Sequence, residues 1–295
     1  MSTHCDGVKA DRVHTMRQSH TPDTVSIRPR LPKFNLEQAL ATNWHSNDPF
    51  KTAFFNALSL TFPIGEKYFI DSVRAFEAEV TEPKLKEEVR GFIGQEAIHR
   101  REHRHYNQVM CASRGIDDRA YQADLQSRID ARDEASRYSR LLETVTFEHL
   151  TAILAHGFLT DPNWLDGADP TMREIWTWHA IEEAEHKAVT FDVYRAARGD
   201  MERLRLALPY VTQQLLKDVF AGIWLILRAD RQHLNPLVWA RGLNWLFGRK
   251  GVLRVMYARW NDFRREDFHP WDHDNRSLIE IWKANGEPEL LNLPA

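Results

Sequence analysis

This sequence has few cysteines, no long apolar run and no large excess of positive or negative charge. The two cysteines, Cys5 and Cys111, cannot form the framework of a disulfide-stabilised protein, so we expect a reducing, cytoplasmic location. The formal net charge of -3 at pH 7 lacks the strong positive field that recruits nucleic acid, and no nucleic-acid partner is expected. The N-terminal stretch contains no apolar centre of a signal peptide, which agrees with that location.

One uncharged apolar segment, Val219 to Leu227, is closed by Asp218 on one side and Arg228 on the other. It is far shorter than the ~20 residues that a membrane-spanning helix needs, so we expect no transmembrane segment. A buried core helix is the first interpretation of this segment. A helix that lies on a membrane surface or against a partner is the alternative.

Helical periodicity dominates the rest of the chain, and no convincing strand appears. Asp48-Pro49 and Asp169-Pro170 indicate helix starts, because the acidic side chain caps the helix and proline suits its first turn. We therefore predict an all-α protein. Its parts are a flexible N-terminal arm over 1–45 and a single helical di-metal domain over 46–295, divided into a ligand bundle over 47–199 and a C-terminal helical extension over 200–295. The expected helices span about 48–80, 83–110, 119–159 with a break left open in its first half, 170–197, 202–231, 236–247, 252–260 and 277–284.

The string Glu-x-x-His, a common pair of metal ligands on a helix, begins at Glu96, Glu102, Glu183 and Glu266. Helical phase separates these occurrences. Glu96 and Glu183, each with the histidine three residues later, lie on the apolar stripe of their helices. Glu102 is expected on a solvated face, and Glu266 falls in an irregular segment bounded by proline.

The two inward pairs alternate along the chain with two single inward glutamates. The order is one helix with Glu66, one with Glu96 and His99, one with Glu148, and one with Glu183 and His186, which is the pattern of a four-helix dinuclear carboxylate site. Four carboxylates would balance two divalent ions, and one imidazole for each ion would supply a neutral nitrogen ligand. Buried Glu/His pairs without metal are the structural alternative. With His179 added, the candidate metal ligands are Glu66, Glu96, His99, Glu148, His179, Glu183 and His186.

His179 lies one helical turn before Glu183 on the same face. It is either a further nitrogen ligand or a group that holds Glu183 in place. His103 is expected to line the core or to support the ligands from behind, and the alternative is that it is itself a ligand. Glu182 and Glu185 are out of phase with Glu183, so we place them on the outer face or behind the ligands.

Several strings resemble a bacterial family known as predicted metal-dependent hydrolases. They include Phe62-Pro63-Ile64-Gly65-Glu66, Gln95-Glu96-Ala97-Ile98-His99, His179 to Ala188 and Phe268-His269-Pro270-Trp271, and the likeness covers roughly residues 27 to 285. The ligand layout also resembles ferritin-like di-iron oxygenases, and His179-x-x-x-Glu183-x-x-His186 is similar to the motif of arylamine N-oxygenases. These resemblances imply a ferritin-like four-helix bundle with additional C-terminal helices.

Three functions are compatible with such a site. The first expectation is a non-haem di-iron oxygenase or oxidase, a monooxygenase-type oxidoreductase that uses O2 and an external electron donor to oxidise a small apolar organic substrate. The alternative is a metal-dependent hydrolase that uses a bridging hydroxide, and the third is non-catalytic metal storage. Two Fe ions are the expected cofactor, with Mn or a mixed Fe/Mn pair as alternatives. The oligomeric state stays open between a monomer and a homodimer.

Overall fold

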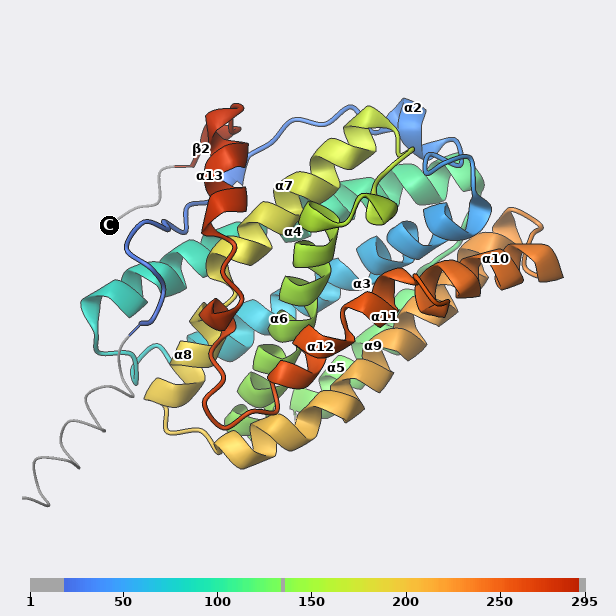
Figure 1. The fold of residues 1–295 in the computed structure, drawn as a ribbon. Coiled ribbons are helices and arrows are strands. Elements are labelled where there is room, and N and C mark those ends of the chain that lie inside the picture. The colour runs from blue at the N-terminus through green and yellow to red at the C-terminus, as the bar shows by residue number, and fades with distance from the viewer. Residues whose placement is uncertain (1–18, 134–135, 292–295) are drawn as a thin grey trace, which may run out of the picture.

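The computed structural model describes residues 19–133 and 136–291, and this part of the chain is almost entirely helical (Figure 1). The prediction of an all-α protein is confirmed. Within the described residues the strands are two short ones, β1 (Arg30–Leu31) and β2 (Glu289–Leu290), which pair antiparallel and join the two ends of the described chain. Helices therefore build both the core and the candidate site.

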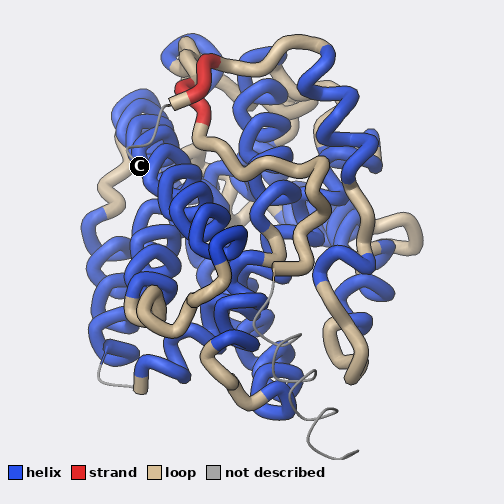
Figure 2. Tube along the Cα trace, turned by 90° about the vertical axis from the view of Figure 1, so that its left-hand side faces the viewer, coloured by secondary structure: helices blue, strands red, loops and turns tan. Residues whose placement is uncertain are grey.

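Four long helices form the central bundle: α3 (Pro49–Arg74), α4 (Pro83–Arg114), α6 (Arg137–Thr160) and α7 (Pro170–His186). α3 packs along α4 and α6 packs along α7, while α3 also contacts α6 and α4 also contacts α7. Figure 2 shows that helices make up most of the described chain and that the two short strands lie at its edge. Each of the four therefore contributes one face to a shared interior.

The predicted helix starts are correct where an acidic residue precedes proline. The side chain of Asp48 accepts hydrogen bonds from the backbone N–H groups of Phe50 and Lys51, at 2.9 and 3.0 Å. Asp169 caps α7 in the same way. Such caps satisfy N–H groups that have no partner within the helix, and this fixes where the helix begins.

Several helix boundaries differ from the predictions. The first long helix ends at Arg74 and is followed by turns, whereas we expected it to continue to about residue 80. In the stretch expected over 119–159, where a break was left open, the chain forms two helices, α5 (Arg119–Asp133) and α6. The helix expected over 170–197 is also divided, into α7 and α8 (Val189–Ala196).

The C-terminal extension packs against the bundle through α9 (Met201–Ala229), which contacts α3 and α6. A Cβ atom added to Gly222 would lie only 2.8 Å from the Cβ of Ala57, so glycine permits the close approach of α9 and α3. Ile223 and Ile226 are buried here, whereas Trp224 is 44% exposed, so the apolar segment buries one face only. The remaining elements are η1 (Pro162–Trp164), α10 (Pro236–Phe247), α11 (Val252–Val255), α12 (Tyr257–Asp262), η2 (Pro270–Asp272) and α13 (Arg276–Ala284).

Among the described residues, no helix combines the length and the apolar character that crossing a membrane requires.

The expected N-terminal arm differs from its prediction over the part that the structure describes. Residues 1–18 lie outside the described residues. Residues 19–45 include β1 and α2 (Glu37–Leu40) and lie against the bundle, with Leu36, Leu40 and Trp44 buried. Apolar residues in this segment are too widely spaced to give a periodic signal, but several of them pack into the hydrophobic core, so the segment is ordered by tertiary contacts.

Candidate metal centre

The seven predicted ligands meet in the interior of the bundle, and all of them are buried. Each helix supplies the residues that the sequence order assigned to it: Glu66 from α3, Glu96 and His99 from α4, Glu148 from α6, and His179, Glu183 and His186 from α7. They fall into three groups, each with potential ligand atoms within 4.8 Å of one another. The groups are Glu66, His99 and His179; Glu96, His99 and Glu183; and Glu96, Glu148 and His186.

One end of this cluster is centred on the Nε2 atom of His186. This nitrogen lies 3.4 Å from a carboxylate oxygen of Glu96, 3.5 Å from one of Glu148 and 3.6 Å from one of Glu183. Four side chains from three helices therefore point at one small volume. Such a convergence of carboxylate oxygens and an imidazole nitrogen is typical of a transition-metal site.

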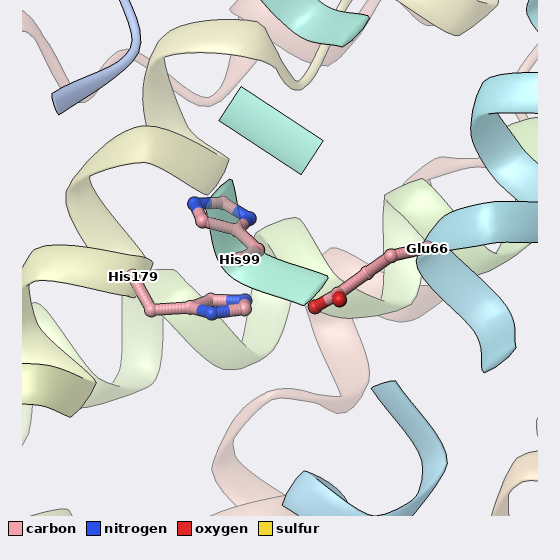
Figure 3. Close-up of side chains that lie close together, drawn as sticks. All are labelled: Glu66, His99 and His179. Atoms are coloured by element: carbon pink, nitrogen blue, oxygen red, sulfur yellow. The ribbon is translucent and has the colours of Figure 1, made fainter. Parts of the chain in front are cut away.

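The other end is formed by Glu66, His99 and His179 (Figure 3). The two imidazole rings stack with their centroids 4.1 Å apart, and the carboxylate of Glu66 points toward them. The Nε2 atom of His179 lies 3.1 Å from Glu183, and the Nδ1 atom of His99 lies 3.7 Å from the same carboxylate oxygen. Glu183 and Glu96 connect the two ends, as bridging carboxylates would.

Most carboxylate oxygens of this cluster lack a hydrogen-bond partner in the surrounding protein. Both oxygens of Glu66, Glu96 and Glu148 have no hydrogen-bond partner among the described residues, and the same holds for one oxygen of Glu183 and for the Nε2 atom of His186. A buried carboxylate without a partner costs several kcal/mol. A pair of divalent ions would supply the missing positive charge, so the residues present fit a dinuclear metal centre.

The pKa values of these side chains reflect the same crowding. Burial, followed by the neighbouring carboxylates, raises the pKa of Glu66 and of Glu148 well above the usual range, and burial also raises the pKa of Glu96. Without cations, the site therefore retains protons on some of its carboxylates.

Two of the candidate imidazole ligands are oriented from behind by a hydrogen bond. The Nδ1 atom of His186 lies 2.9 Å from the amide oxygen of Gln95, which can only accept, so Nδ1 carries the proton and Nε2 is free to bind a metal. The Nε2 atom of His99 lies 3.0 Å from a carboxylate oxygen of Glu182, which leaves Nδ1 facing the cluster. Support of this kind is usual behind metal-ligating histidines.

His179 is oriented by a chain of hydrogen bonds that runs away from the cluster. The amide nitrogen of Asn107 donates to the backbone carbonyl of Ser59, so its amide oxygen accepts from the Ser59 hydroxyl. That hydroxyl then accepts from the Nδ1 atom of His103, at 2.8 Å, and the Nε2 atom of His103 accepts from the Nδ1 atom of His179, at 2.9 Å. The Nε2 atom of His179 is left with a lone pair that faces Glu183, as a ligand requires. His103 thus supports the cluster from behind, which is one of the roles predicted for it.

A second group of charges lies directly behind the cluster, and its central residue was missed by the sequence analysis. The guanidinium of Arg30, in β1, donates to Glu182 at 3.0 Å and to both oxygens of Glu185 at 2.8 Å. Gln95 donates to Glu185 at 2.8 Å and Lys283 pairs with it at 2.8 Å. Glu182 and Glu185 were predicted to lie on the outer face or behind the ligands. They lie behind the ligands, because both are fully buried. No local signal marks Arg30, since it stands alone in an aperiodic segment.

Glu102 was expected on a solvated face, and this prediction is wrong. Only 8% of its surface is exposed, and its carboxylate accepts a hydrogen bond from Arg101 at 2.8 Å. Helical phase alone does not reveal this burial. Glu102 nevertheless belongs to none of the three ligand groups, so the assignment of the true pairs by helical phase is unaffected.

Comparison with known proteins identifies the family of this chain. The family described as "Predicted metal-dependent hydrolase" matches residues 28–274, which include all seven side chains of the cluster. The chain belongs to this family. Members are thus expected to depend on metal, and the buried Glu/His groups could hold it, whereas neither finding supports oxygenase activity.

Outside the family, the similarities are short. The chain is 29% identical to human and to bovine alpha-actinin-3 over 86 residues, which is 29% of this chain and 9% of each relative. Mouse alpha-actinin-3 is 28% identical over the same length. No solved structure matches the chain significantly. The function therefore has to be argued from the family and from the site.

Proposed function

We propose that this protein is a two-metal-dependent hydrolase whose ions are held by Glu66, Glu96, His99, Glu148, His179, Glu183 and His186. Membership in the metal-dependent hydrolase family supports the reaction class. The observation that carries the metal site is the set of buried carboxylate oxygens of Glu66, Glu96 and Glu148 that have no hydrogen-bond partner among the described residues. Two divalent ions supply such a site with a Lewis acid and with a water of lowered pKa for attack on an ester, amide or phosphate bond.

The chain itself contributes orientation, shielding and proton control. Gln95 and Glu182 fix the imidazoles of His186 and His99, and His103 fixes His179, so the three ligand nitrogens are set before metal arrives. Glu66 is the single glutamate that α3 adds to the cluster, and both of its oxygens face the interior. A carboxylate in that place is suited to accept the proton of an attacking water.

A second candidate function is oxidation of an organic substrate with O2 at two iron ions, with electrons from an external donor. The position of His179 favours it, because a third imidazole adds a nitrogen ligand to an otherwise carboxylate-rich site. The full burial of the ligands also favours it, since a strong oxidant has to be kept from water.

Metal loading separates the two functions. Chelated protein would be loaded separately with Zn²⁺, Mn²⁺ and, without air, Fe²⁺, and metal content, cleavage of p-nitrophenyl esters and uptake of O2 would be measured. We expect cleavage that appears with metal, disappears with chelator and is absent in Glu183→Gln. Glu102→Gln is the matched control and should keep both its metal and its activity. O2 uptake by the iron-loaded protein without cleavage by any metal form would replace hydrolysis by the second function.

A further inference from the structure

A large cavity lies between the bundle and the C-terminal extension. It has a volume of about 480 Å³ and is bounded by α3, α6, α9 and the segment from the end of α10 to α12. Volumes of this size are typical of sites for small organic molecules. Its walls include Leu58, Leu150, Leu154, Leu215, Val219 and Trp260.

The walls of this cavity offer almost no hydrogen bonds to a guest. The hydroxyl of Thr212 donates to the carbonyl of Leu208, at 2.7 Å, and accepts from the indole nitrogen of Trp260, at 2.9 Å, so it is already satisfied. Arg254 is the one charged residue in the lining, and it is exposed. A polar guest would therefore lose its hydrogen bonds to water on entering, whereas a hydrocarbon chain would gain about 25 cal/mol for each Å² that it buries.

A smaller cavity of about 70 Å³ lies next to the large one. Leu58, Leu154 and Leu215 line both cavities, so these three side chains separate them. Glu66 lies in the wall of the smaller cavity, which also has room for water. Three leucine side chains thus stand between the large cavity and the space beside a candidate metal ligand.

We propose that the 480 Å³ cavity binds the hydrocarbon chain of the substrate, an ester or amide of a long-chain acyl group, whose reacting carbonyl reaches the metal centre beside Glu66. This inference rests on the proposed function, and it adds the substrate class. The polar group passes Leu58, Leu154 and Leu215 into the smaller cavity, while the chain stays among the apolar walls. In hydrolysis, water adds to the carbonyl carbon, the bond to the leaving oxygen or nitrogen breaks, and the leaving group takes a proton.

The mouth of the cavity fits a guest of this kind. Phe247 and Tyr257 belong to its lining, yet they are 43% and 63% exposed. Large apolar side chains that stay in contact with water at a cavity entrance often mark a binding site. A chain longer than the cavity could continue over them.

The first test measures chain binding without any reaction. Binding of cis-parinaric acid, a fluorescent long-chain fatty acid, would be titrated on metal-free protein under nitrogen. Leu216→Trp fills the cavity from α9, and Leu253→Trp fills it from α11. We expect each variant that retains the wild-type circular dichroism to bind at least tenfold more weakly. Leu206→Trp, at a position 67% exposed on the same helix α9, is the matched control and should bind as the wild type does. The proposal would be overturned if both filled variants bound the probe as tightly as the wild type, or if the control lost as much binding as they do.

The second test asks whether the chain reaches the metal centre. Co²⁺ quenches fluorescence over short distances, so Co²⁺-loaded protein should quench bound parinarate. Glu183→Ala, which lacks the carboxylate that approaches both His179 and His186, should not. Failure of quenching in protein that contains Co²⁺ would refute the path past Leu58, Leu154 and Leu215. Because neither test requires turnover, a protein that binds and quenches the probe but cleaves no ester would contradict only the proposed hydrolysis.

Discussion

Two groups of buried glutamates meet at α7, and they differ in how their negative charge is compensated. Glu182 and Glu185 are fully buried and are paired with Arg30, with further donors from Gln95 and Lys283. Glu183 lies between them in sequence and belongs to the ligand cluster, where both oxygens of Glu66, Glu96 and Glu148 have no hydrogen-bond partner among the described residues. One turn of one helix thus carries a charge-balanced group and an unbalanced one.

This difference separates the glutamates whose charge the protein itself compensates from those whose charge it leaves without a partner. Buried carboxylates of equal exposure cannot be distinguished by burial alone, because both groups are fully enclosed. Their partners distinguish them, since a guanidinium already compensates one group, whereas the other would need protons or bound cations. The comparison therefore predicts opposite responses to substitution and to chelation.

The largest effect is expected from loss of a carboxylate on the metal side. Glu148→Ala removes two oxygens of the His186 end of the cluster, so the variant should lose at least one metal ion per chain while the helices persist. Metal analysis together with circular dichroism measures both outcomes. Glu102→Ala, at a buried glutamate outside the cluster, should retain its metal. Full metal content in Glu148→Ala would show that Glu148 is not a ligand.

The next largest effect is expected on the Arg30 side, and it concerns stability. Arg30→Met leaves Glu182 and Glu185 buried without their main partner, which typically costs about 3–5 kcal/mol when a buried ion pair is broken. Urea denaturation of the metal-free variant and wild type measures the loss. The double variant Arg30→Met with Glu185→Gln should recover part of it, because one of the unpaired charges is gone. A wild-type midpoint for Arg30→Met would mean that other groups balance these carboxylates.

Gln95 joins the two groups, since its oxygen accepts from His186 and its nitrogen donates to Glu185. Gln95→Leu should lower metal affinity about 10–100-fold, as is usual when a group that orients a ligand is lost. Competition with a chromogenic chelator measures this change. In Gln95→Glu the new carboxylate can still accept the hydrogen bond from His186, but it adds a negative charge beside Glu185. This variant should therefore keep most of its metal affinity while its free energy of unfolding falls. Unchanged affinity in both variants would remove Gln95 from the support of the site.

A smaller effect is expected from pH in the chelated protein. The pKa values of Glu66 and Glu148 are raised in the folded state, so the stability that they contribute is present below their unfolded value of 4.5 and is lost as pH rises through the raised values. Bound metal keeps these carboxylates deprotonated and removes that loss. The difference in unfolding free energy between metal-loaded and chelated protein should therefore grow as pH rises from about 5 toward 9.

This difference measurement also cancels titrating groups that lie outside the cluster. Lys187, whose pKa burial lowers to about 7, changes charge in the same window, but it does so in both forms of the protein. His179, whose pKa burial lowers to about 4, is already neutral there. A stabilisation by metal that stays constant or shrinks over this window would contradict the assignment of Glu66 and Glu148 to the cation-binding group.

Helical phase and residue order were sufficient to predict the helices and the inward residues. A helix repeats its faces every few residues, so the positions of Glu96, His99, Glu183 and His186 follow from the apolar pattern around them. Capping residues fixed the helix starts for the same reason, because their hydrogen bonds are local. By contrast, the break between α7 and α8 has no marker in the sequence, and we have no physical account of it.

The sequence by itself determined an all-α protein, the alternation of ligand types along four helices, and the face on which each candidate ligand lies, because these properties depend on neighbours within a few turns. Only the tertiary structure decided what lies behind and beside those ligands. Arg30 reaches Glu182 and Glu185 across more than a hundred residues of chain, and the cavity beside Glu66 is closed by helices from both halves of the protein. Charge compensation and cavities depend on distance in space, and local patterns do not contain that information.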